Sequence, residues 1–143
     1  MECIILTGLQ ASGKSAFYVQ KFVHTHVRIN LDMLRTRNRE RQLIQACLGT
    51  KTKFVVDNTN VTKESRAKYI ELAKSANFAV HGYYLDVPLQ RCLELNGSRG
   101  SSVPPVAIVS AYKKLHVPTK EEGFDQLFFV TNSEEGFIIE ELS

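Results

Sequence analysis

The feature that most constrains the fold of this chain is a glycine-rich segment near its N-terminus, Gly8-Leu9-Gln10-Ala11-Ser12-Gly13-Lys14-Ser15. It matches in full the Walker A pattern, in which glycines let backbone N–H groups wrap around the phosphates of a nucleotide. Such a loop needs a buried strand before it and a helix after it. The sequence meets both needs, because residues 3–6 are apolar and residues 15–23 carry apolar side chains at helical spacing.

Individual positions of this loop have distinct tasks. Gly8 and Gly13 permit the close approach and the φ values that a Cβ would hinder, and the helix beginning near Gly13 directs its positive dipole end at the β-phosphate. We expect Lys14 to reach the β- and γ-phosphates, and the Ser15 hydroxyl to ligate Mg²⁺. The predicted nucleotide-binding residues of the loop are Gly8, Ala11, Ser12, Gly13, Lys14 and Ser15.

Length and composition exclude several classes of protein. The 143 residues suit one domain, and 43% hydrophobic with 23% charged residues is ordinary for a soluble globular protein. No apolar run could span a bilayer, and the Walker A segment occupies the place of a signal peptide, so we expect a cytoplasmic protein with no membrane partner. The three cysteines and four histidines lack metal-site spacing, and the cysteines are expected to be buried thiols.

Positive charge is concentrated in the middle of the chain. The net charge of +3 does not by itself indicate a nucleic-acid binder. Four arginines nevertheless fall within residues 35–41, and five further basic residues follow between Lys51 and Lys68. A solvated helix face and a groove for a polyanion both explain this pattern.

Short apolar runs alternate with helical patterns, which is typical of an α/β sheet. Later strands are predicted at residues 27–30, 54–57, 79–85, 127–130 and 137–139. Later helices are predicted at residues 36–48, 62–76 and 88–95 and from Pro104-Pro105 onward. Gly49 is expected to end the first of these helices and Thr62 to cap the next. The sequence thus predicts a P-loop NTPase-type parallel sheet flanked by helices, with a short mobile lid at about 96–104.

Polar segments follow three of the predicted strands. They are the Walker A loop, residues 30–35, and Asp57-Asn58-Thr59-Asn60. A parallel sheet binds ligands at the carboxyl ends of its strands, so we expect the three segments to share one crevice. Asp57 stands where a Walker B aspartate is expected, from which it could hold Mg²⁺ through water.

The residues of this crevice favour kinase chemistry over other uses of a phosphate-binding loop. The Asn-Lys-x-Asp motif of a GTPase is absent, and Asn58 stands where a motor ATPase usually has a catalytic acid. Phosphoryl transfer needs an acceptor placed in line and often a carboxylate that receives its proton. Asp32 can be that carboxylate, and Arg35 can hold an anionic group of the same acceptor. A helix cap at Asp32 and a solvated surface role for Arg35 remain alternatives.

These segments resemble the kinase domain of polynucleotide 5′-hydroxyl kinases. The resemblance rests on residues 8–15, 29–35, 55–60 and 112–124 and extends to about Val130. Residues 57–60, the helix start at Ser65-Arg66-Ala67 and residues 112–124 are similar to the animal kinase/phosphatase type. The Asp32-x-x-Arg35 spacing is more similar to the phage type.

The resemblance implies roles for residues on the acceptor side. Asp32 matches the general base that activates the 5′-OH of a nucleic-acid end, and Arg35 matches an arginine that contacts the 3′-phosphate of the same nucleotide. Thr59, with Asn58, matches the segment lining the acceptor phosphate. Arg66 matches a basic helix position that can contact the strand, although an exposed helical arginine is an equal alternative.

The resemblance also implies a donor side and a set of partners. Arg99 matches the lid arginine that closes on the ATP phosphates and stabilises the transferring group. Leu95 stands where the phage-type lid has a second arginine, so this lid supplies fewer cations unless Arg91 substitutes for it. The implied catalytic residues are Asp32, Lys14 and Arg99, with ATP and Mg²⁺ as cofactors. The Asp-x-Asp-x-Thr motif of the partner phosphatase is absent, so we expect a phosphatase or ligase to come from other chains.

The leading hypothesis is therefore one P-loop kinase domain, residues 1–143, that phosphorylates 5′-OH ends of RNA or DNA. Two alternatives stay open. The acceptor could be a small alcohol such as a nucleoside, sugar or antibiotic, or the protein could be a nucleotide-binding regulator with little turnover. The presence of both Asp32 and Arg99 argues against the regulator.

Overall fold

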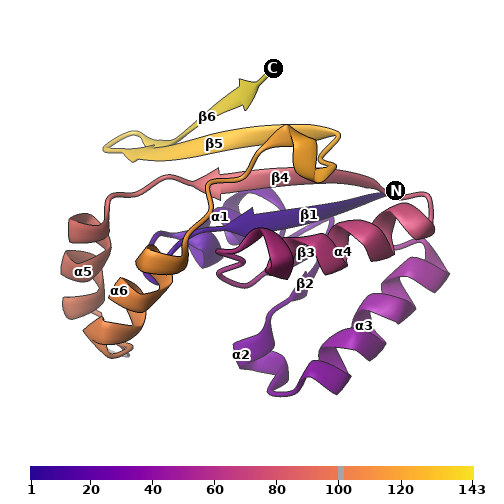
Figure 1. Cartoon of the computed structure of the whole chain (residues 1–143), viewed down its shortest axis with the longest axis horizontal. Helices are drawn as coiled ribbons and strands as arrows, with labels where there is room; N and C mark the ends of the chain where they lie inside the picture. Colours follow the sequence, from indigo (N-terminus) through magenta and orange to yellow (C-terminus); the bar gives the residue numbers. More distant parts are fainter. Residues whose placement is uncertain (100–101) are drawn as a thin grey trace.

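The computed structural model describes residues 1–99 and 102–143, and its centre is a six-stranded sheet with the order β2-β3-β1-β4-β5-β6 (Figure 1). The strands from β2 to β5 in that order run parallel, and β6 pairs antiparallel with β5. The predicted parallel α/β sheet is confirmed, with one antiparallel strand at its edge. The strands are β1 (Glu2–Thr7), β2 (Val27–Ile29), β3 (Phe54–Asp57), β4 (Ala79–Leu85), β5 (Gln126–Ser133) and β6 (Gly136–Leu142).

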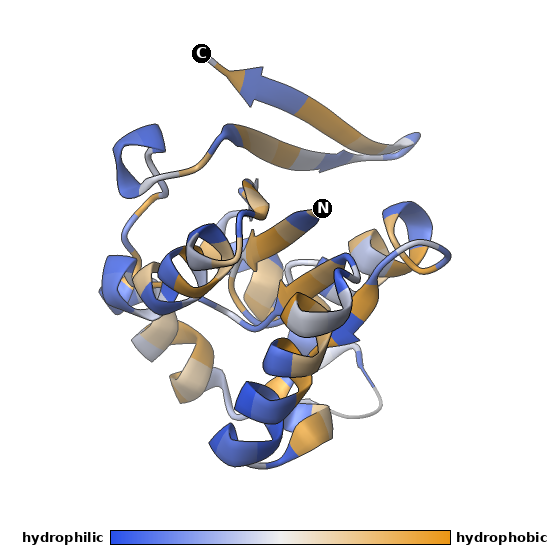
Figure 2. Ribbon diagram, turned by 90° about the vertical axis from the view of Figure 1, so that its right-hand side faces the viewer, coloured by the Kyte–Doolittle hydropathy of each residue, from blue (hydrophilic) through white to orange (hydrophobic). Residues whose placement is uncertain are grey.

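Helices cover both faces of the sheet. They are α1 (Lys14–Lys21), α2 (Leu31–Leu34), α3 (Arg37–Thr50), α4 (Lys63–Ser75), α5 (Leu89–Gly97), α6 (Pro105–Lys114) and the 3₁₀ turn η1 (Lys120–Glu122). Successive side chains of a strand point to opposite faces. Cys3 and Ile5 of β1 accordingly pack in the core beneath α3 and α4, whereas Ile4 and Leu6 pack beneath α1. In Figure 2 the central strands are mostly hydrophobic, and the covering helices mix hydrophobic and hydrophilic residues.

This strand order determines where a ligand can bind. The neighbouring strands β1 and β3 lead to α1 and α4, which lie on opposite faces of the sheet. The loops that leave such a pair diverge and open a crevice at the carboxyl ends of the strands. Helices α5 and α6 lie beyond the same ends, with a small core of their own around Leu9, Cys92 and Ile108 (Figure 1).

Helix boundaries test the predicted capping signals. Thr62 caps α4 as expected, and its hydroxyl accepts a hydrogen bond from the Ser65 N–H at 3.0 Å. The stop predicted at Gly49 is wrong, because α3 continues through this residue to Thr50. Lys51 takes a left-handed conformation instead, with a φ of 56°, and its N–H and that of Thr52 cap the last carbonyls of the helix.

The predicted lid at 96–104 falls partly on Gly100 and Ser101, which lie outside the described residues. Asn96 and Gly97 belong to α5, and Asn96 is buried. The side-chain amide of Asn96 donates to the Val103 carbonyl and accepts from the Val103 N–H, which closes the base of the segment. Within residues 1–99 and 102–143, no helix has the length and apolar character needed to cross a membrane.

Candidate functional site

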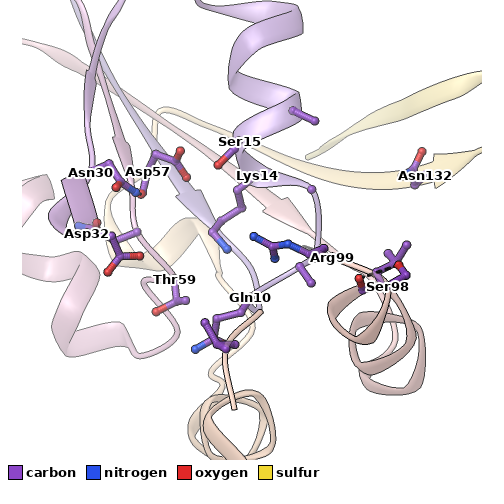
Figure 3. Close-up of a pocket in the computed structure, with 16 residues that line it drawn as sticks. Gln10, Lys14, Ser15, Asn30, Asp32, Asp57, Thr59, Ser98, Arg99 and Asn132 are labelled. Atoms are coloured by element: carbon purple, nitrogen blue, oxygen red, sulfur yellow. Dashed lines mark hydrogen bonds between the residues drawn. The ribbon is translucent and has the colours of Figure 1, made fainter. Parts of the chain in front are cut away.

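A cavity of about 440 Å³ opens at the crevice predicted by the strand order; we call it the loop cavity (Figure 3). The Walker A loop, the residues after β2 and β3, and the end of α5 line it. Figure 3 shows Lys14, Asp32 and Arg99 extending into the same space from three different segments. The predicted convergence of three strand ends on one crevice is confirmed by this lining.

The backbone of the Walker A loop has the conformation that wrapping a phosphate requires. Gly13 precedes α1 with a φ of 100°, and Ala11 also has a positive φ of 65°. A Cβ on Gly8 would lie 2.6 Å from the Ser12 hydroxyl and 3.3 Å from Leu85 Cβ, so a larger residue there would force its neighbours to shift. The Gly8 N–H donates to the Thr59 carbonyl at 3.0 Å, which ties the loop to the segment after β3.

Lys14 is held inside the loop rather than extended into solvent. Its Nζ donates to the carbonyl oxygens of Gly8 and Leu9 at 3.0 and 2.9 Å. Burial lowers the pKa of Lys14 to about 8, although the nearby carboxylate of Asp57 opposes the shift. An arriving phosphate would restore the charge of the ammonium, because an adjacent anion favours the protonated form.

Ser15 and Asp57, the two predicted metal-binding residues, are joined by an arginine that the sequence reading missed. Arg28 donates from Nε to Asp57 Oδ2 at 2.7 Å and from its terminal nitrogen to Ser15 Oγ at 3.0 Å. Asp57 is only 1% exposed. A hydroxyl and a carboxylate within reach of one cationic group are oxygen donors of the kind that Mg²⁺ prefers. These residues therefore fit the metal that a P-loop implies.

Asp32 lies in the first turn of α2 with an exposed side chain. The helix cap is Asn30, whose side chain accepts from the Met33 N–H at 2.9 Å. Asp32 is therefore not the cap, and its carboxylate makes no hydrogen bond or ion pair with any other described residue. It faces the loop cavity opposite Lys14, as Figure 3 shows.

A buried polar network fixes the position of the short helix that carries Asp32. Asn58 Oδ1 accepts from the Leu31 N–H at 2.9 Å, and Asn58 Nδ2 donates to Glu40 at 3.1 Å. Glu40, only 4% exposed, also accepts from Tyr69 and Arg37. Burial, with Glu40 beside it, raises the pKa of Tyr69 to about 12, so this hydroxyl remains a donor at neutral pH. Asn58 was predicted to bind the acceptor, but its amide is engaged in holding α2.

A second cavity of about 340 Å³, the side cavity, adjoins the loop cavity. The two share Asp32, so its carboxylate stands at their junction; the other shared residues are Gln10, Asn58, Thr59 and Val103. Two cations, Arg37 and Lys68, line only the side cavity. Burial and the proximity of Arg37 lower the pKa of Lys68.

Two arginines expected to contact the acceptor lie elsewhere. Arg35 ends α2 with a φ of 79° and lines neither the loop cavity nor the side cavity. Arg66 is fully buried, and it donates to both carboxylate oxygens of Glu122 at 2.8 and 3.0 Å and to the Asn60 carbonyl at 2.8 Å. The expectation that Arg66 contacts a nucleic-acid strand is wrong, and so is the alternative of an exposed helical arginine, because the buried side chain serves as an internal brace.

The donor side includes Arg99 and a further cavity. Arg99 is exposed just past α5 and extends toward Lys14 (Figure 3). An outer cavity of about 590 Å³ lies on the other side of the loop, between α5 and the β5–β6 hairpin. Ser12, Pro88, Arg91 and Asn132 contribute to its walls. Such a mixed polar and apolar space next to a phosphate loop suits a nucleoside.

A Walker A loop on this parallel sheet, with a carboxylate facing its lysine across a cavity, defines a P-loop protein of the kinase type. The chain belongs to the family described as AAA domain, whose model matches residues 3–114. The descriptions of its curated relatives name kinases of polynucleotides and of L-seryl-tRNA(Sec).

Curated proteins and solved structures are similar to the chain. The bifunctional polynucleotide phosphatase/kinase of Schizosaccharomyces pombe is 29% identical over 86% of this chain and 32% of its own length. A protein of Acanthamoeba polyphaga mimivirus, provisionally described in the same words, is 32% identical over 91% of this chain and 33% of its own. The L-seryl-tRNA(Sec) kinase of Methanococcus maripaludis is 28% identical over 85% of this chain and 55% of its own length.

The chain thus spans about a third of the two phosphatase/kinase relatives. Among solved structures, Kti12 of Chaetomium thermophilum, determined in complex with ADP-AlF3, matches with a TM-score of 0.72. It is 16% identical, and the match covers 93% of this chain and 92% of that one. This likeness supports the fold.

Proposed function

We propose that this protein is an ATP- and Mg²⁺-dependent kinase that transfers the γ-phosphate of ATP to the 5′-hydroxyl of an RNA or DNA end. The observation that carries the proposal is the place of Asp32. Its carboxylate stands at the junction of the loop cavity and the side cavity, opposite Lys14, and makes no bond to any other described residue. In-line transfer requires a base placed between the phosphate donor and the acceptor hydroxyl.

On the donor side, the Walker A loop would hold the phosphates of ATP and the outer cavity its nucleoside. Lys14 would exchange its two carbonyl partners for phosphate oxygens, and Arg99 would add a second positive charge at the transferring group. Ser15 and Asp57 would hold Mg²⁺, which, when bound, offsets negative charge on the phosphates.

On the acceptor side, Asp32 would accept the proton of the attacking hydroxyl. The network of Asn58, Glu40 and Tyr69 supports this role, because it holds α2 in place without engaging the Asp32 carboxylate. Arg37 and Lys68 in the side cavity would contact a phosphate next to the terminal nucleoside. Two cations beside the base favour a polyanionic acceptor over a neutral alcohol.

The similarity to two polynucleotide phosphatase/kinases supports a polynucleotide acceptor. A second candidate is a hydroxyl on an aminoacyl-tRNA, which the similarity to an L-seryl-tRNA(Sec) kinase favours. Both acceptors carry phosphates that Arg37 and Lys68 could contact.

The test is incubation with labelled ATP and MgCl₂ against a panel of acceptors: single-stranded RNA and DNA with 5′-OH ends, the same strands with 5′-phosphates, seryl-tRNA, nucleosides and sugars. We expect label on the 5′-OH oligonucleotides and none on their 5′-phosphorylated controls. Acceptor KM should rise steeply with salt, because phosphate contacts release counterions. Label on a neutral sugar alone, or on seryl-tRNA alone, would contradict the polynucleotide assignment.

A further inference from the structure

Arg28 bonds both Ser15 and Asp57, the two residues proposed to hold Mg²⁺. It is the middle residue of β2, and its guanidinium reaches across to β3 and α1. There it bonds Asp57 Oδ2 at 2.7 Å and Ser15 Oγ at 3.0 Å. With Asp57 only 1% exposed, this guanidinium is its charge partner in the described structure.

The contacts of Arg28 compete with metal binding in a specific way. Its N–H groups bond Ser15 Oγ and Asp57 Oδ2, oxygens that a divalent cation, or the water through which Asp57 would hold it, would also contact. Like charges repel strongly in a partly buried site, so the guanidinium and Mg²⁺ cannot both take the place between these oxygens. One of them must leave when the other binds.

We propose that Arg28 is a positioning residue that bridges Ser15 and Asp57, and so keeps them close enough to bind one cation, before the metal–nucleotide complex binds. When that complex binds, Mg²⁺ takes the place of the guanidinium. The inference rests on the proposed use of Mg²⁺ and ATP. In the position in which it bonds Asp57 and Ser15, the guanidinium carbon of Arg28 also lies 5.9 Å from the centre of the Tyr18 ring. Cation–π attraction acts over that distance.

The exchange has a measurable signature, the factor by which Mg²⁺ tightens ADP binding. In the natural protein Mg²⁺ must first displace Arg28, which lowers this factor. In Arg28→Met the buried carboxylate loses its ion-pair partner and gains more from Mg²⁺. We expect the factor to rise about 10- to 100-fold, the range that one charge-assisted hydrogen bond produces.

Calorimetric titration of ADP in EDTA and in MgCl₂ measures this factor for each variant. Arg41→Met is the matched control, because Arg41 is an exposed arginine on α3 that bonds only Asn38 among the described residues. It should leave the factor unchanged. In an Asp57→Asn background, adding Arg28→Met should change the factor little, since the carboxylate for which Arg28 and Mg²⁺ compete is already absent. If Arg28→Met does not fold, Arg28→Gln is measured in the same way.

An unchanged factor in Arg28→Met, whatever its melting temperature, would overturn the exchange and leave a purely structural ion pair. A factor of one in the natural protein would overturn the exchange together with the proposed use of Mg²⁺. Acceptor specificity does not enter the measurement, so failure of the exchange is distinguishable from failure of the polynucleotide assignment.

Discussion

Replacement of Arg66 by Met tests whether this arginine braces the fold or contacts the acceptor. Its side chain is 0% exposed and makes a two-pronged ion pair with Glu122 and a third bond to the Asn60 carbonyl. Removing one partner of a buried ion pair costs about 3–5 kcal/mol, because the remaining charge stays desolvated. Among the described residues, Glu122 then keeps only its bond from the Thr119 N–H. We expect a loss of about 3–5 kcal/mol against a total stability of about 5–15 kcal/mol.

Urea unfolding followed by far-ultraviolet circular dichroism measures this loss, since the chain has no tryptophan. A loss of this size lowers the melting temperature by roughly 10–15 °C in a domain of this length. Arg41→Met, on the exposed face of α3, is the control and should change stability by less than about 0.5 kcal/mol. Replacing Arg66 and Glu122 together by Met and Leu should recover part of the loss. Near-normal stability of Arg66→Met with weakened acceptor binding would refute the bracing role.

Three further predictions follow from the site and the core. Burial lowers the pKa of Lys14 from 10.5 to about 8, so between pH 8 and 10.5 the unfolded chain binds more protons at this group than the folded protein. The contribution of Lys14 to stability therefore rises with pH across that window. Calorimetry in buffers of different ionisation enthalpy should also show proton uptake when ADP binds above pH 8. Lys68→Met should raise acceptor KM and flatten its salt dependence by about one counterion, with kcat little changed, whereas Lys63→Met, exposed at the start of α4, should leave the salt slope unaltered. Gly82→Ala places a Cβ 2.7 Å from the Phe124 ring and should cost about 1–3 kcal/mol in urea unfolding; a loss below about 0.5 kcal/mol would show that the ring moves freely.

The parts of this protein that could be predicted from sequence are those encoded locally. The glycines of the Walker A loop themselves permit its conformation. The residues that flank the strand at Phe54–Asp57 mark where it begins and ends. Thr62 indicated the start of α4 because a capping threonine and an acidic first-turn residue, Glu64, lie two residues apart in the sequence. The stop at Gly49 failed because α3 is capped by the left-handed Lys51 two residues later. Glycine adopts a left-handed conformation at little energetic cost, but its presence does not force the chain into that conformation.

The parts that could not be predicted depend on partners distant in the chain. Arg28 meets Asp57 across 29 positions, and Arg66 meets Glu122 across 56. Spacing cannot show whether an arginine on a helix faces solvent, a cavity or a buried carboxylate. The alternatives for Arg66 therefore stayed open until its neighbours were known. Lys68 belongs to the basic run visible in the sequence, but only the fold places it on the face of α4 that lines the side cavity.

The role of Asp32 is tested most directly by single-turnover transfer from labelled ATP to a 5′-OH oligonucleotide by Asp32→Asn. Asparagine keeps the size of the side chain and cannot accept the hydroxyl proton. We predict a fall in the transfer rate of about 10²- to 10⁴-fold, with ADP affinity and melting temperature close to those of the natural protein. Transfer by Asp32→Asn at the natural rate would contradict the assignment of Asp32 as the base.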